Sequence, residues 1–366
     1  MCTTLTLKTE NGSVIVGRTD EFGNYYHNDL VLFPRNYVFT NRALGDGPLK
    51  IKSQYAILGT NVGTLFGEKL SIPELIDDGM NEAGLSMSML YFPSYAHYKF
   101  VDELSNTQMD VTALGRSILA KCATLEEVTT YITAFQGKFV AQIDQPLHYM
   151  FVDKTGNSLI AEPDKPGYFT LYKENNGIMT NSPSYNYHMM NLNQYVNVQQ
   201  IDGNVSSPIK GACGKEIYAH GISGGFGLPG DTSPASRFIR ASYFRDTTTR
   251  KDLITANDGV LRMFRILNNF DITPGMSLKH LGAGKGEGSA GANANPVDYK
   301  NVAAGHTDHT DIKDLENGRY FYKTQNNQSP RYAQFSDYDL NAKQVRYISM
   351  ENDDSISYQK VSLNIL

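Results

Sequence analysis

The sequence contains no tryptophan, no long apolar run and no block of basic residues. Without about 18 consecutive apolar residues, the chain predicts no membrane-spanning helix. It also lacks the basic stretch followed by an apolar segment that is typical of a signal peptide. The formal net charge is only −5, and the Lys and Arg residues are scattered, so a nucleic-acid or anionic-membrane partner is not expected. We therefore expect a cytoplasmic protein without such partners.

Cysteine is also scarce. The three cysteines, Cys2, Cys122 and Cys213, are far apart and odd in number, which favours reduced thiols over a disulfide framework. Apolar residues make up 40% of the 366 residues, and 23 Tyr and 17 Phe are among the large side chains. These rings can fill an ordinary core or line an apolar ligand pocket. The length allows one large domain or two ordinary ones.

Cys2 directly follows Met1. Removal of the initiator Met, which a small residue at position 2 favours, would leave a free α-amine on the residue that carries the thiol. An α-amine has a pKa of about 7.7–8.0, so it can accept the thiol proton near neutral pH. The pattern predicts that Cys2 is a nucleophile with its own general base.

A β-hairpin is predicted at the N-terminus. Residues 2–9 alternate between apolar and polar types, and the Asn-Gly pair at 11–12 is typical of a two-residue turn. The return strand covers residues 14–22. Counting outward from a two-residue turn places Cys2 opposite Glu21, which would bring a carboxylate to the nucleophile.

Arg18 lies on the same return strand and could lower the pKa of the Cys2 thiol as a nearby fixed cation. It is three positions from Glu21, so the two side chains lie on opposite faces of a regular strand. Both can reach Cys2 only if the strand bulges or ends there.

The remaining pattern favours α+β layers over a βαβ array. Thr124–Glu127 is a capping box, and Ser233-Pro234 is typical of a helix start. Strands are expected at 30–33, 53–58, 84–91, 148–153, 158–162 and 168–172, and helices at 125–135, 233–244 and 260–267. The Gly-rich stretch at 282–295 is interpreted as a loop.

Three further positions could contribute chemistry. Asn181 precedes Ser182-Pro183, so its amide could donate to an oxyanion or form an Asx turn. Arg237 lies in the first turn of its helix, where the macrodipole disfavours a cation, so we expect a specific partner. His306 and His309 have metal-ligand spacing. On a predicted loop without a clear third ligand, however, a solvated turn is the favoured interpretation.

Several sequence blocks, in order along the chain, resemble the choloylglycine hydrolase family. They are Met-Cys2-Thr-Thr, Gly17-Arg18-Thr, Phe33-Pro34-Arg35-Asn36-Tyr37, Asp78-Gly79-Met80-Asn81-Glu82, Leu90-Tyr91-Phe92-Pro93, Pro146-Leu147-His148, Thr180-Asn181-Ser182-Pro183, Asn191 to Tyr195 and Leu228-Pro229-Gly230-Asp231 with Pro234 to Phe238. The resemblance implies a single N-terminal-nucleophile amidase domain over residues 1–366, with a variable insertion at 280–330. The implied fold is a four-layer αββα sandwich, often tetrameric, with no metal or organic cofactor.

The resemblance also implies roles for individual residues. Cys2 would be nucleophile and base, Arg18 would support the sulfur, Asn181 would hold the oxyanion, and Arg237 would complete the active site. The family's usual Asp is replaced by Glu21, and Asp20 stands where an apolar pocket residue is typical. Either carboxylate could therefore take the family role.

Within the family, Tyr91 resembles the Tyr of penicillin V acylases more than the Asn of many bile salt hydrolases. A Tyr ring offers a stacking face for a phenoxyacetyl group, so an acylase acting on penicillin V is the expected function. A conjugated bile salt hydrolase is the alternative. A second alternative is a catalytically silent binding protein, since an extra carboxylate beside Cys2 would oppose thiolate formation.

Overall fold

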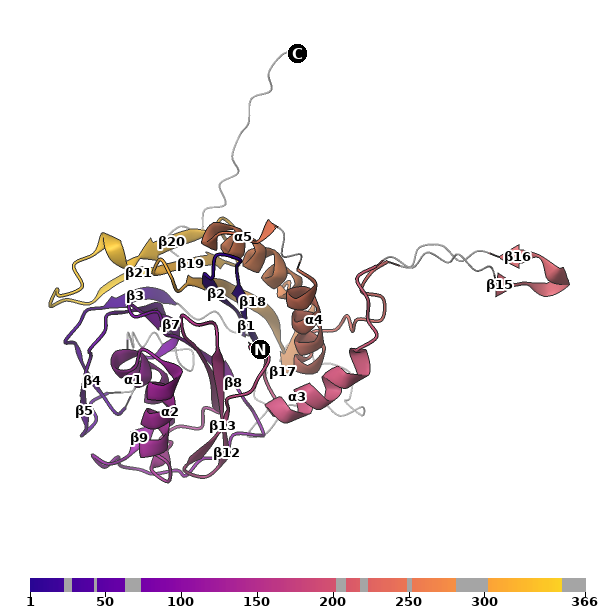
Figure 1. The fold of residues 1–366 in the computed structure, drawn as a ribbon. Coiled ribbons are helices and arrows are strands. Elements are labelled where there is room, and N and C mark those ends of the chain that lie inside the picture. Colours follow the sequence, from indigo (N-terminus) through magenta and orange to yellow (C-terminus); the bar gives the residue numbers. More distant parts are fainter. Residues whose placement is uncertain are drawn as a thin grey trace, which may run out of the picture.

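The computed structural model describes residues 1–22, 28–42, 45–62, 74–201, 209–217, 223–248, 252–280 and 302–350. Two antiparallel sheets face each other, and helices cover the outer face of each (Figure 1). This arrangement confirms the predicted α+β fold with αββα layers. The Gly-rich stretch at 282–295 lies outside the described residues.

The first sheet carries the N-terminal hairpin at its centre. Its strand order is β14-β1-β2-β18-β19-β20, and β17 also pairs with β18. The strands are β1 (Cys2–Lys8), β2 (Val14–Phe22), β14 (Ile178–Met179), β17 (Ser277–His280), β18 (Val302–Asp314), β19 (Arg319–Thr324) and β20 (Arg331–Gln334).

The second sheet has the order β13-β12-β11-β8-β7-β6-β3-β21. Its strands are β3 (Asp29–Phe33), β6 (Ile57–Asn61), β7 (Ile76–Asn81), β8 (Ser86–Tyr91), β11 (Leu147–Val152), β12 (Ser158–Lys165), β13 (Tyr168–Tyr172) and β21 (Arg346–Ser349). Short two-stranded pairs join β4 (Val38–Thr40) to β5 (Lys50–Lys52), β9 (Met109–Asp110) to β10 (Phe139–Val140) and β15 (Ile209–Lys210) to β16 (Glu216–Ile217).

Helices α4 (Pro234–Thr247) and α5 (Ala256–Leu267) pack on the first sheet, and α1 (Leu114–Lys121) packs on the second. The other helices are α2 (Leu125–Ala134) and α3 (Tyr185–Leu192), with 3₁₀ turns at Val111–Ala113, Asn193–Tyr195, Ala212–Gly214, Asn268–Phe270 and Phe335–Asp337. None of the helices in the described ranges has both the length and the hydropathy that crossing a bilayer requires.

Local capping signals determine where two of these helices begin. Thr124 and Glu127 form the predicted capping box at the start of α2. Ser233 caps α4, and Pro234 occupies its first turn. In both cases a side-chain oxygen accepts a hydrogen bond from a backbone N–H that has no partner within the helix. Both predicted helix starts are confirmed.

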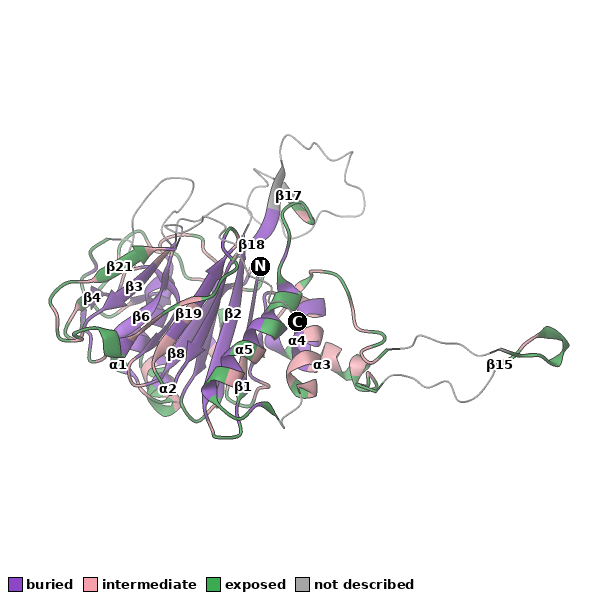
Figure 2. Ribbon diagram, turned by 90° about the horizontal axis from the view of Figure 1, so that it is seen from above, coloured by how far each residue is buried: buried purple, intermediate pink, exposed green. Residues whose placement is uncertain are grey.

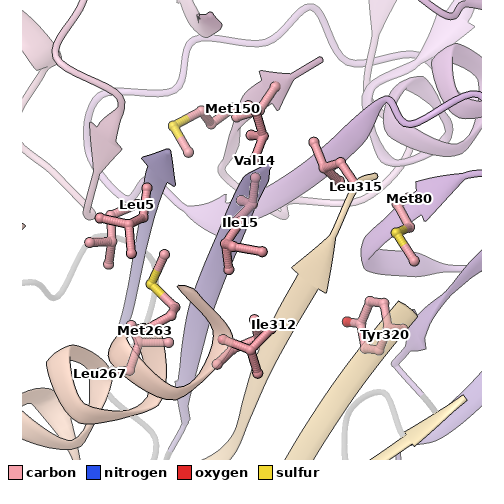
Figure 3. Packing of buried hydrophobic residues seen from close by; sticks show 14 of the residues in the cluster. Leu5, Val14, Ile15, Met80, Met150, Met263, Leu267, Ile312, Leu315 and Tyr320 are labelled. Carbon is pink, nitrogen blue, oxygen red and sulfur yellow. The ribbon is translucent and has the colours of Figure 1, made fainter. Parts of the chain in front are cut away.

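The apolar core of the first sheet lies between the sheet and α5. Met263 and Leu267 of α5 pack with Leu5, Ile15 and Ile312 of the central strands (Figure 3). At Gly17, between these strands and the helix, an added Cβ would lie 2.5 Å from the Cγ of Met263. The close approach of helix and sheet therefore depends on a residue without a side chain.

The layer between the two sheets is buried but partly charged. The central strands of both sheets are buried along most of their length (Figure 2). Lys313 of β18 pairs there with Asp78 of β7, and neither side chain is exposed. The hydroxyl of Tyr320 also donates to Asp78, at 2.9 Å. Because an unpaired charge would be costly here, these contacts hold the two sheets in one register.

The N-terminal hairpin differs from its prediction by one residue. Thr9 and Ser13 face each other across a three-residue loop, with Gly12 at a positive φ of 90°. The backbone N–H of Glu10 donates to Leu253 instead of pairing with Ser13. The predicted two-residue turn was wrong because the loop is bonded to the segment before α5, which local sequence does not reveal.

The predicted solvated turn at His306–His309 was also wrong. Both residues lie within β18 and are only 3% exposed. The strand forms because β2 pairs with it along one edge and β19 along the other.

Candidate active site

Cys2 begins β1 and is buried between the two sheets. Its Sγ lies 3.3 Å from Oδ1 of Asp20, to which the thiol donates, and 3.7 Å from Nη2 of Arg18. One carboxylate and one guanidinium therefore contact the sulfur directly.

The carboxylate next to Cys2 is Asp20, and the predicted pairing of Cys2 with Glu21 was wrong. The longer hairpin loop pairs Cys2 with Asp20 in the β1–β2 ladder. Since side chains alternate along a strand, this one-residue shift exchanges the faces of Asp20 and Glu21. It also places Arg18 and Asp20 on one face, so β2 needs no bulge for both to reach the sulfur.

Glu21 lies instead on the face toward the helices, where it is buried. Burial raises the pKa of its carboxyl to about 7, although the Arg237 guanidinium and the chain terminus oppose this increase. Its backbone N–H donates to the carbonyl of Met1 at 2.7 Å, and the Met1 amine donates to the Glu21 carbonyl. Met1 therefore extends the hairpin beyond Cys2.

Asn181 lies next to the backbone nitrogen of Cys2. Strand β14 pairs with β1 and carries the chain to this position. The Asn181 Oδ1 accepts from the Cys2 backbone N–H at 2.8 Å, and Nδ2 donates to the Tyr91 carbonyl at 2.7 Å. An amide nitrogen has two hydrogens, so one remains for a further acceptor.

Arg237 is fully buried and joins these groups from the first turn of α4. Its Nη2 donates to Oδ1 of Asn181 and its Nη1 donates to the Thr3 hydroxyl, both at 2.7 Å. Nη1 also donates to the Cys2 carbonyl. Because a guanidinium only donates, it orients the Asn181 amide with Oδ1 toward Cys2. The specific partners expected for Arg237 are thus Asn181, Thr3 and the Cys2 carbonyl.

The thiol of Cys2 is strongly held in its neutral form. Burial raises its pKa to about 11, the Asp20 carboxylate adds to the increase, and Arg18 opposes it. The pKa of Asp20 is low despite burial, because Arg18 and His309 stabilise its charge.

Tyr91 ends β8 and is half-buried. Its backbone carbonyl is held by Asn181, which places the residue beside the site. Burial raises the pKa of its phenol, so the hydroxyl stays neutral.

Three charged residues lie behind Arg18 and Asp20; sequence reasoning missed Asp77 and Asp311 and assigned His309 to a solvated turn. Asp77 of β7 accepts from Nη1 of Arg18 at 2.7 Å. His309 and Asp311 of β18 form an ion pair at 3.1 Å. The alternation of charged residues at 309, 311 and 313 could have indicated a strand with one charged face.

Two strand irregularities position these residues. Asp77 is an extra residue in β7, so both it and Asp78 can point toward the first sheet. Asp308 is an extra residue in β18, between the pairs Thr307–Glu21 and His309–Asp20. Bulges of this kind redirect side chains at functional sites.

Asp20, Asp77 and His309 bring atoms of metal-ligand type within 4.8 Å of one another. The Arg18 guanidinium already lies between the two carboxylates, 3.2 Å from Asp20 and 2.7 Å from Asp77. The cation that these two carboxylates bind is therefore a side chain of the protein.

Comparison with known proteins identifies the family. The family model of linear amide C–N hydrolases, choloylglycine hydrolase family, matches residues 2–285. A bile salt hydrolase/transferase from Clostridium perfringens is 28% identical over 98% of this chain and 99% of its own length. A penicillin V acylase from Pectobacterium atrosepticum is 25% identical over 72% of this chain and 67% of its own length.

Solved structures show the same relationship. The C2A variant of the conjugated bile acid hydrolase from Clostridium perfringens has a TM-score of 0.77 at 27% identity, covering 99% of this chain and 100% of its own. Penicillin V acylase from Agrobacterium tumefaciens has a TM-score of 0.69 at 19% identity, covering 95% and 91%, and this likeness concerns the fold alone. The resemblance found in the sequence is thus confirmed: the chain belongs to the choloylglycine hydrolase family of linear amide C–N hydrolases.

Proposed function

We propose that this protein hydrolyses the amide bond of conjugated bile acids through a thioester on Cys2. The observation that carries the chemistry is the position of Cys2, whose sulfur contacts Arg18 and whose nitrogen contacts Asn181. Once Met1 is removed, that nitrogen becomes an α-amine beside the thiol.

The reaction can then proceed in two steps. The α-amine takes the thiol proton, the thiolate attacks the amide carbonyl, and the amine returns the proton to the leaving amino group. Asn181 has a second Nδ2 hydrogen with which to bind the oxyanion. In the second step the amine activates a water molecule, which cleaves the thioester and releases the bile acid and the free thiol.

Arg18 and Arg237 support this chemistry in different ways. Arg18 lies next to the sulfur and stabilises the negative charge of the thiolate. Arg237 orients Asn181 and the Cys2 carbonyl, so its role is to keep the nucleophile and the oxyanion donor in fixed positions.

The substrate assignment changes from the one favoured by Tyr91 alone. The bile salt hydrolase relative matches nearly the whole chain, whereas the penicillin V acylase relative matches 72% of it at lower identity. These comparisons favour the bile-acid alternative. In this proposal the half-buried ring of Tyr91 packs against the steroid instead of a phenoxyacetyl group.

Parallel assays test the proposal. Protein without Met1 is incubated with glycocholate, taurocholate and penicillin V, and amine release is measured. We expect at least one bile salt to be cleaved with a kcat/KM more than tenfold above that for penicillin V. Cys2→Ser and Met1-retaining protein serve as controls and should be inactive. A penicillin V preference would reverse the substrate assignment, and a fully active Met1-retaining enzyme would contradict the mechanism.

A catalytically silent binding protein is the second candidate. The Asp20 carboxylate, 3.3 Å from the Cys2 sulfur, supports it because this charge opposes thiolate formation. Iodoacetamide at neutral pH distinguishes the two, since prompt labelling of Cys2 supports an enzyme and inertness supports the silent protein.

The homotetramer implied by the family resemblance stays a prediction, which light scattering can check.

A further inference from the structure

We propose that His309 is a positioning residue of the active site, which holds Asp20 from behind so that Oδ1 of Asp20 faces the Cys2 sulfur. The inference rests on the proposed role of Cys2. It adds to the site a residue of β18, far from the N-terminal nucleophile in sequence.

Charged groups follow one another from Asp311 through His309 and Asp20 to the sulfur. Nε2 of His309 lies 3.1 Å from Oδ2 of Asp311 and 4.0 Å from Oδ2 of Asp20. The same Oδ2 of Asp20 lies 3.2 Å from Arg18. Two cationic groups therefore approach one oxygen of Asp20, which leaves Oδ1 for Cys2 at 3.3 Å.

The bulge at Asp308 brings His309 to this position. Without the extra residue, the register set by Thr307 and Glu21 would place Asp308 opposite Asp20 and turn His309 to the other face. The register shift instead pairs His309 with Asp20 directly. Both His309 and Asp311 are buried, so water does not screen their interaction with Asp20.

The charges around His309 favour an imidazolium. Asp20, Asp77 and Asp311 face it from β2, β7 and β18, Asp308 is also near, and Arg18 is the neighbouring cation. Burial lowers the pKa of His309, but the carboxylates outweigh burial and raise it to about 10.

The other ring nitrogen of His309 lies beside a side-chain amide. Nδ1 of His309 lies 3.2 Å from the side-chain amide of Asn28. An imidazolium donates from both nitrogens, and a half-turn of the Asn28 amide presents Oδ1 as the acceptor. The positive charge of His309, in addition to that of Arg18, offsets part of the negative charge around the Cys2 sulfur.

The test measures the pH midpoint of Cys2 alkylation by iodoacetamide in full-length protein without Met1. We expect His309→Gln to raise the midpoint by about 1 pH unit or more, because a nearby positive charge is lost. His309→Lys restores a cation and should return the midpoint toward the wild-type value. His306→Gln is the matched control, since His306 lies on the same strand but pairs with Asp308 at 2.7 Å, and its midpoint should not change.

An unchanged midpoint in folded His309→Gln protein overturns the proposal. If that variant does not fold, ¹⁵N NMR of histidine-labelled wild-type protein decides the question. One of the eight histidines should stay doubly protonated above pH 8, and full deprotonation of all eight by that pH overturns the proposal. Inert Cys2 in the wild type would instead contradict the proposed function, while the NMR result would still test His309 independently.

Discussion

Asp20→Asn is expected to lower the pKa of the Cys2 thiol, and Arg18→Met is expected to raise it. At an effective dielectric constant of about 20, a unit charge on Asp20 at 3.3 Å disfavours the thiolate by about 5 kcal/mol. Arg18 at 3.7 Å favours it by about 4.5 kcal/mol. The two effects nearly cancel, which agrees with burial as the largest cause of the raised thiol pKa.

Removing one of the two charges leaves the other unopposed. The Asp20→Asn variant should therefore have a thiol pKa lower by as much as about 4 pH units, and the Arg18→Met variant should have one higher by as much as about 3 pH units. The double variant should lie near the wild type, since it loses both contributions. The three variants and the wild type form a double-mutant cycle.

The assay is the rate of Cys2 carbamidomethylation as a function of pH, followed by mass spectrometry on protein without Met1. Circular dichroism confirms that each variant is folded. An Asp20→Asn midpoint equal to or above the wild-type midpoint would refute the reasoning. It would mean that Asp20 acts mainly by holding Arg18 against the sulfur.

Three further predictions concern stability, measured as the free energy of unfolding in urea. Lys313→Met should cost about 3–5 kcal/mol because it leaves Asp78 charged and buried; a loss below 1 kcal/mol contradicts this. Gly17→Ala should cost about 1–3 kcal/mol, since the new Cβ meets Met263, and an unchanged urea midpoint speaks against that packing. Glu21 has a pKa raised from 4.5 to about 7. Its contribution to the free energy of unfolding is therefore fully present below pH 4.5 and falls by about 3 kcal/mol as the pH rises through 7. Glu21→Gln should lack this pH dependence, and a slope equal to the wild type's would exclude Glu21 as its source.

Local sequence patterns were sufficient for the elements whose signals lie within one segment. The capping box at Thr124 and the Ser233-Pro234 start were both confirmed, because a cap is a contact between residues two or three positions apart. Strand β13 was predicted with its observed ends at Tyr168 and Tyr172, since alternation between two faces is a property of neighbouring residues.

The family resemblance added the layers of the fold and most of the candidate site. Cys2, Arg18, Asn181 and Arg237 do lie together, although 235 positions separate the first from the last. No local pattern contains that proximity. It follows from the pairing of β14 with β1 and from the packing of α4 against β1.

The identity of the carboxylate beside Cys2 was decided by tertiary structure. The N–H of Glu10 finds an acceptor in Leu253, which lengthens the hairpin loop and exchanges the faces of Asp20 and Glu21. A contact more than 240 residues away in sequence thus determines which acid reaches the sulfur.

The charged layer between the sheets could not be predicted from the sequence, for a related reason. His309, Asp311 and Lys313 are residues that usually face water, so placing their segment on an exposed loop led to the prediction of a solvated turn at His306 and His309. Their burial depends on charges from other strands: Asp20 and Asp77 lie near His309, which pairs with Asp311, and Asp78 pairs with Lys313. The sequence by itself determined which residues could carry the chemistry, and the tertiary structure decided their partners, because charge pairing and strand register depend on segments that meet only in the folded protein.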